Sequence, residues 1–120
     1  MTVDVVERFL AAMVAHDWDA LAGCVAADVQ RIGPFGDRYA GREEYLKFIS
    51  ELMPSLPGYH MHVSKITDTG HRAFAELSET VEVNGAPHVT PEVLVFDLDD
   101  AGLIAHIDIY IKTAGPSLSL

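Results

Sequence analysis

The chain has 120 residues, of which 49% are hydrophobic and 22% charged, proportions typical of one folded globular domain. Eighteen acidic residues against eight basic ones give a formal net charge of -10, which argues against nucleic-acid binding and anionic membrane surfaces. No apolar run approaches the roughly 20 residues that span a bilayer. The single cysteine, Cys24, excludes an internal disulfide and fits a reducing cytoplasm. We therefore expect one cytoplasmic domain over residues 1–120.

Three helical patterns occupy most of the first half of the sequence. Asp4 and Glu7 have the spacing of a capping box, and apolar residues then recur at helical intervals as far as residue 14. Asp17 is placed to cap a second helix, which follows so closely that the two helices should form a hairpin. A third helix is predicted over residues 42–53, where Pro54 ends it. Between the second and third helices, residues 29–32 are a short candidate strand.

From Tyr59 onward the hydrophobic pattern changes to the two-residue period of β-strands. Turn residues at 68–70, 84–85 and 99–102 divide this half into four strands, and we expect the tail over 115–120 to fray. The element order is therefore two helices, a strand, a helix and four antiparallel strands. This order predicts the α+β class, with a curved, mostly antiparallel sheet wrapped around three N-terminal helices.

The predicted last strand carries a carboxylate inside an aliphatic run. Alternation puts its isoleucines on one face and His106, Asp108 and Tyr110 on the other. Burying a carboxylate without partners is costly, so Asp108 must be paired, protonated or exposed to a wet cavity. We predict that Asp108 is an acid facing a cavity.

Two glutamates interrupt the neighbouring strands in a similar way. Glu79 lies on the more apolar face of the predicted strand over residues 73–83. Glu92 alternates with apolar residues on the following strand, although Pro91 can mark a bulge and leaves its facing open. We treat both as further candidate catalytic acids.

Six histidines raise the question of a metal site. His60 and His62 share one face of a strand, and His106 or Asp108 would complete a set of three ligands. Two histidines one residue apart are a weak motif, however, and no nucleotide or zinc-helix signature is present. We expect neither a metal ion nor a cofactor.

The segments 5–12, 16–21 and 26–29, followed by Gly33-Pro34-Phe35-Gly36, resemble the start of delta-5-3-ketosteroid isomerases. Over the whole chain, the element order resembles the nuclear transport factor 2-like superfamily, which includes SnoaL-like polyketide cyclases and limonene-epoxide hydrolases. The resemblance implies a cone-shaped α+β barrel that encloses a hydrophobic pocket, and it implies a homodimer.

The resemblance also implies roles for individual residues. In the isomerases, an aspartate base and a helix tyrosine stand at the positions of Gly33 and Phe9, so steroid isomerisation in its familiar form is not expected. The isomerases' third group, a protonated acid that donates a hydrogen bond to the oxyanion, has a counterpart in Glu92. In the cyclases and hydrolases the last strand carries an acid, which matches Asp108. The hydrolases add a second acid, which matches Glu79, and an arginine two residues before it, where this chain has Leu77.

We therefore expect a small acid-base enzyme of the isomerase, cyclase or epoxide hydrolase type, acting on an apolar, oxygenated small molecule. Asp108 would be the general acid or base, with Glu79 and Glu92 as further catalytic residues. The residues expected to contact the ligand are His106, Tyr110, Trp18, Phe35, Phe48 and Tyr59. The alternative is a non-catalytic domain of the same fold that binds a small molecule or dimerises.

Overall fold

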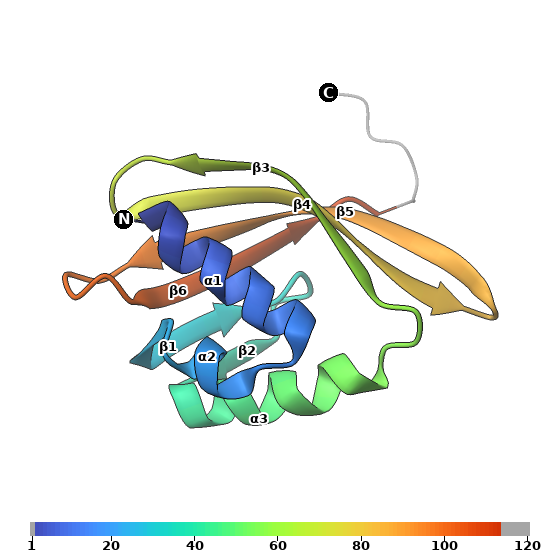
Figure 1. The fold of residues 1–120 in the computed structure, drawn as a ribbon, viewed down its shortest axis with the longest axis horizontal. Helices are drawn as coiled ribbons and strands as arrows, with labels where there is room; N and C mark the ends of the chain where they lie inside the picture. Colours follow the sequence, from blue (N-terminus) through green and yellow to red (C-terminus); the bar gives the residue numbers. More distant parts are fainter. Residues whose placement is uncertain (1, 114–120) are drawn as a thin grey trace.

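The structure is a computed structural model that describes residues 2–113 (Figure 1). The helices are α1 (Thr2–Ala15), α2 (Trp18–Ala22) and α3 (Arg42–Leu52), and a 3-10 turn, η1 (Met53–Ser55), follows α3. The strands are β1 (Val25–Ile32), β2 (Arg38–Ala40), β3 (His60–Asp68), β4 (Arg72–Val83), β5 (Ala86–Leu98) and β6 (Ile104–Ile111).

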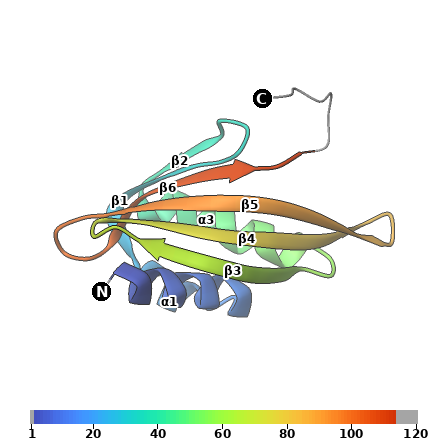
Figure 2. The same ribbon diagram turned by 90° about the horizontal axis from the view of Figure 1, so that it is seen from above.

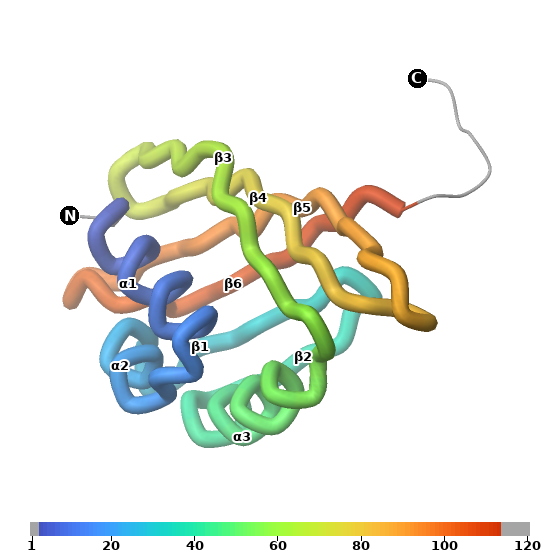
Figure 3. Tube along the Cα trace, turned by 45° about the vertical axis from the view of Figure 1, so that its right-hand side comes forward, coloured from blue at the N-terminus to red at the C-terminus, as the bar shows by residue number. Residues whose placement is uncertain are grey.

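The six strands of the described chain form one curved sheet in the order β2-β1-β6-β5-β4-β3. Every neighbouring pair is antiparallel except β1 and β6, which run parallel. The helices α1, α2 and α3 lie on one side of the sheet, which curves around them (Figures 1 and 3). Figure 2 looks onto the sheet from above, with α3 behind it. The predicted α+β cone is confirmed.

The sequence pattern located most elements correctly and missed three details. Helix α1 already includes Thr2, so Asp4 lies in its first turn and is not the N-cap that the capping-box spacing implied. Asp17 caps α2 as predicted, since its Oδ1 accepts the backbone N–H of Ala20 at 3.1 Å. Strand β1 begins at Val25, four residues earlier than expected, because α2 ends after five residues. Strand β2 was not predicted, since three residues are too few to show an alternation. The predicted fraying of residues 115–120 lies outside the described residues.

The core is centred on the ring of Phe9, which is completely buried on α1. Its centroid lies 6.4 Å from the Tyr45 ring of α3 and 5.6 Å from the Phe96 ring of β5. One side chain therefore joins two helices to the middle of the sheet. Because aromatic side chains contribute most of the apolar area in a core of this size, this contact fixes the helices on the inner face of the sheet.

Alternation along the strands separates an inner face, toward the helices, from an outer face. The core residues Leu77 of β4 and Leu94 and Phe96 of β5 lie on the inner face. Glu79 and Glu92 continue these same two rows, so both glutamates belong to the inner face. Within residues 2–113, none of the helices is long and apolar enough to cross a lipid bilayer.

We predict that Phe9→Ala lowers the free energy of unfolding by about 3–5 kcal/mol, because it leaves a cavity between two helices and the sheet. Urea unfolding followed by circular dichroism measures the change. Phe35→Ala is the matched control: its ring is 84% exposed, so the loss should stay within about 0.5 kcal/mol. Equal effects of the two substitutions would contradict this view of the core.

Candidate active site

The inner face of the sheet brings two predicted acids together. Glu79 of β4 pairs across the sheet with Thr90 of β5, and Glu92 pairs with Leu77. The two glutamates are therefore diagonal neighbours on one face, a separation that long side chains bridge. Glu92 is only 9% exposed. The uncertainty about its facing after Pro91 is thus resolved in favour of the interior.

The surroundings of Glu92 favour its neutral form. Burial, a hydrogen bond to Glu79 and the negative charge of Glu79 raise the pKa of Glu92 to about 9, while the Arg31 charge opposes this shift. Two carboxylates that face each other in a poorly solvated place share a proton rather than both ionising. At neutral pH, Glu92 therefore carries a proton that it can donate.

The phenol of Tyr59 orients the other acid of the pair. Tyr59 lies just before β3, and its hydroxyl donates a hydrogen bond to Oε2 of Glu79. Burial, followed by the charge of Glu79, raises the pKa of Tyr59 above its ordinary range, so the phenol remains a donor. Glu79 is thus held as a hydrogen-bond acceptor beside the protonated Glu92.

A cation that the sequence pattern did not single out lies inside the cone. Arg31 of β1 is 8% exposed, and its NH1 group donates to Oδ2 of Asp37 at 2.6 Å. The guanidinium carbon lies 4.8 Å from the centre of the Phe48 ring and 5.7 Å from that of Tyr39. The signal was present in the predicted strand over residues 29–32, where Arg31 shares a face with the buried Val29.

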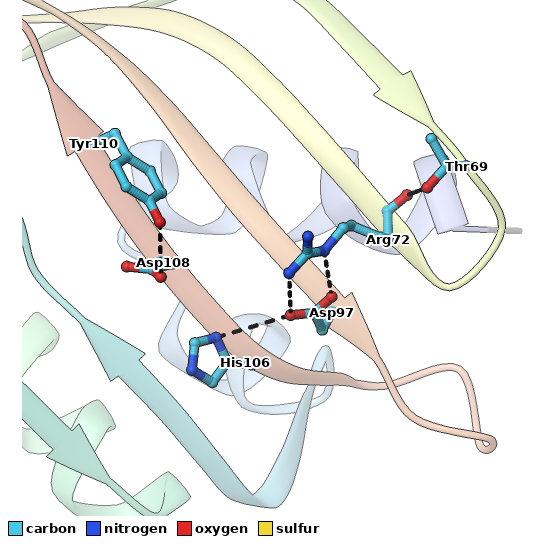
Figure 4. Close-up of polar contacts among 6 residues, drawn as sticks. All are labelled: Thr69, Arg72, Asp97, His106, Asp108 and Tyr110. Atoms are coloured by element: carbon cyan, nitrogen blue, oxygen red, sulfur yellow. Dashed lines mark hydrogen bonds and ion pairs between the residues drawn. The ribbon is translucent and has the colours of Figure 1, made fainter.

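The last strand presents its polar residues on the opposite side from the one we expected. His106, Asp108 and Tyr110 lie on the outer face, in front of the sheet in Figure 4, with the helices behind it. The expectation that Asp108 faces the enclosed cavity is therefore wrong. The predicted alternation along β6 is correct, but the isoleucines occupy the inner face and the polar residues the outer face. This arrangement is favoured because it buries Ile107 in the core. Asp108 and Glu79 are on different faces of the sheet.

On the outer face, these side chains belong to a polar cluster. Asp97 accepts hydrogen bonds from Arg72 at 2.8 and 3.3 Å, and its Oδ2 lies 4.0 Å from Nδ1 of His106. The Tyr110 hydroxyl donates to Oδ2 of Asp108 at 3.2 Å (Figure 4). Asp108 thus has a partner on a solvent-facing surface, and neither it, His106 nor Tyr110 reaches the inner acids.

The remaining predicted ligand contacts are spread over different places. Trp18 stacks on His16 at 5.4 Å, away from the acids, and Phe48 stacks on Tyr39 at 3.8 Å, beside Arg31. Phe35 stands at the exposed tip of the β1–β2 turn. Of the six residues, Tyr59 contacts an inner acid directly.

A hollow of about 670 Å³ lies between the β1–β2 turn and strands β5 and β6, and it is lined by neighbours of Glu92 and not by the two acids themselves. Its lining includes Phe35, Val89, Thr90 and Ile111. Thr90 precedes Glu92 by two positions on the same face, and Ile111 is the cross-strand partner of Glu92.

An apolar groove of about 520 Å³ between α1 and β3 offers no comparable chemistry, because Glu7 is the one titratable side chain among the described residues that line it. Within residues 2–113, no group of three or more His, Cys, Asp or Glu side chains is arranged to hold a metal ion. The paired acids are therefore the best candidate for a reactive centre.

The fold of the chain matches that of several solved proteins. A candidate ketosteroid isomerase from Kribbella flavida matches with 20% identity and a TM-score of 0.81, covering 98% of this chain and 82% of its own. An epoxide hydrolase from M. tuberculosis, of the type called LEH-like, matches with 20% identity and a TM-score of 0.80, covering 92% and 82%.

A candidate SnoaL-like polyketide cyclase from Shewanella denitrificans has 11% identity and a TM-score of 0.82, covering 92% of this chain and 90% of its own. At these identities, the solved structures establish the fold alone.

The chain matches no protein with a curated description. The sequence profile of the SnoaL-like domain family matches residues 6–107. The chain therefore belongs to the SnoaL-like domain family.

Proposed function

We propose that the protein is a small acid-base enzyme that acts on an apolar, oxygenated small molecule, with Glu92 as the proton donor and Glu79 as the proton acceptor. The observation that carries this proposal is the pairing of these two carboxyls on the inner face, with Tyr59 hydrogen-bonded to Glu79. The role first expected for Asp108 passes to Glu92, because Asp108 lies on the outer face.

The pair offers one proton to give and one site to receive a proton. Glu92 would donate its proton to a carbonyl, alkoxide or epoxide oxygen as negative charge develops there. Glu79 would accept a proton from carbon or from an attacking water, so the charge on the enzyme is conserved over the step. Isomerisation, aldol cyclisation and epoxide opening all fit this balance, and all three occur among enzymes of this superfamily.

The hollow between the β1–β2 turn and strands β5 and β6 supports the substrate class. Phe35, Val89 and Ile111 give it an apolar lining, while Thr90 offers a hydroxyl near the acids. His88, Lys112 and Thr113 complete its polar part. A hollow with both kinds of side chain suits a molecule with an apolar carbon skeleton and at least one oxygen. The residues proposed for the chemistry require no metal and no organic cofactor.

The alternative is a non-catalytic domain that binds a small molecule or dimerises. Its best support is the outer face, where the aromatic residue Tyr110 is 59% exposed. With either function we propose a homodimer in a reducing cytoplasm, where the buried free thiol of Cys24 would persist.

Homodimerisation predicts a particle of twice the mass of one chain in light scattering at micromolar concentration. Tyr110→Asp should shift this particle toward the monomer, because it puts a charge on the exposed apolar part of the outer face. A monomeric wild type would contradict the proposed dimer without affecting the acid pair.

We predict that Glu92→Gln flattens the dependence of stability on pH. The pKa of Glu92 is raised in the folded state, so between the unfolded and the folded values the native protein binds the extra proton, and wild-type stability falls as pH rises. Between pH 5 and pH 8, the wild type should lose about 1–3 kcal/mol relative to the variant. Urea unfolding at a series of pH values measures this, and parallel curves would contradict a protonated Glu92.

We predict that Glu92→Ala lowers kcat/KM by about 10²–10³-fold, the usual effect of removing a donor to a developing oxyanion. The assay screens a cyclic β,γ-unsaturated ketone, an apolar epoxide and an aldol substrate by chromatography. Asp108→Asn is the matched control, and it should leave the rate within about twofold, as expected for a change remote from the chemistry. Ligand binding without turnover in all three classes would favour the non-catalytic alternative.

A further inference from the structure

The structure joins two residues on either side of the β1–β2 turn. Arg31, near the end of β1, donates to the carboxylate of Asp37, just before β2. The Gly33 N–H donates to the backbone oxygen of Asp37 at 2.7 Å, which closes the turn between them. Neither charged residue entered the proposed chemistry.

We propose that Asp37 is a positioning residue: it holds Arg31 at the β1–β2 turn and keeps that cation from pairing with Glu92, which therefore stays a proton donor. This inference rests on the proposed function of Glu92. It assigns a role in the same site to Arg31, Gly33 and Asp37.

Gly33 is the first support for this role. A β-carbon at this position would clash with both carboxylate oxygens of Asp37 and would lie 2.6 Å from NH1 of Arg31. The backbone of Gly33 does not have a positive φ, so its conformation alone does not require glycine. The absence of a side chain is what makes room for the ion pair at this place.

Aromatic rings supply the second support. The guanidinium of Arg31 lies over the rings of Phe48 and Tyr39, which stack on each other. Arginine is favoured in such places because its planar group stacks and bonds at the same time. With the rings on its face and Asp37 at one nitrogen, the cation has a defined orientation.

The consequence for Glu92 follows from the charged and titratable groups that influence it. The groups that act on Glu92 electrostatically are Glu79 from β4, Tyr59 from the segment before β3, and Arg31 from β1, whose side chain lies on the same inner face. Arg31 is the one cation among them, and a cation in contact with a carboxyl favours its ionised form. If Arg31 left Asp37 and turned to Glu92, the donor proton would be lost at neutral pH.

The test is a pH titration of Glu92 by carbon-13 NMR on protein labelled at the glutamate δ-carbons, with the signal assigned by Glu92→Gln. The variants are Asp37→Asn, which removes the charge at the turn, and Gly33→Ala, which keeps both charges but leaves no room for the Asp37 carboxylate and NH1 of Arg31 to meet where they do. The atoms in the way at Gly33 are the ends of two flexible side chains, Asp37 and Arg31, so the backbone of the turn can remain in place. Asp97→Asn is the matched control, because it breaks the Arg72–Asp97 ion pair on the outer face.

In both turn variants, we expect the pKa of Glu92 to fall by about one unit or more, a tenfold change in proton affinity, and in the control to stay unchanged. A normal carboxyl pKa for Glu92 in the wild type would overturn the proposed function itself. If the pKa of Glu92 is high in the wild type and Gly33→Ala leaves it unchanged, only the positioning role is overturned. This holds even if Asp37→Asn lowers the pKa, because the loss of the Asp37 charge would then explain that change without any movement of Arg31. If Asp37→Asn does not fold, the result for Gly33→Ala decides alone.

Discussion

The contact between the carboxyl groups of Glu79 and Glu92 is the constraint around which the inner face of this sheet is arranged. Two acids so close in a poorly solvated place cannot both be charged without a large cost. The neighbouring groups reduce this cost in different ways: Tyr59 donates to Glu79, and Glu92 retains its proton. An arrangement of this kind weakens the domain, since apolar residues at the same positions would be easier to bury. Functional sites commonly keep such unfavourable pairs.

The charges around the pair are distributed so that each acid has a different environment. Arg31, the buried arginine near the site, is already bonded to Asp37. The outer face contains a second arrangement of the same type, in which Arg72 and Asp97 are joined beside His106. The inner acids and the Arg72–Asp97 cluster lie on opposite faces of the same single-layered sheet. Which face a residue occupies therefore decides whether it can take part in the chemistry, and a shift of one position along a strand separates Ile107 from Asp108.

Most of the fold was predictable, because long amphipathic helices and alternating strands leave clear patterns. The short elements were not: β2 has three residues, and α2 has five.

The candidate site was half predictable. Glu79 and Glu92 stood out because each interrupts an apolar row of its strand. A residue in such a row faces the interior in the folded protein. Asp108 was misplaced because alternation divides a strand into two faces without saying which face turns inward. Arg31 was overlooked because a four-residue segment, in which it shares a face with Val29, is too short to show which face is buried. Its ion pair with Asp37 depends on a turn that only the three-dimensional structure reveals.

The most direct test of the central claim is an infrared difference spectrum of the wild type against Glu92→Gln at neutral pH. A protonated carboxyl absorbs as an isolated carbonyl stretch, well separated from the bands of carboxylates. If Glu92 holds its proton beside Glu79, the wild type should show this band and the variant should lack it. A difference spectrum that contains only carboxylate bands would mean that Glu92 is ionised in the folded protein. The buried pair would then not be an acid with its partner base, and the proposed chemistry would have no proton donor.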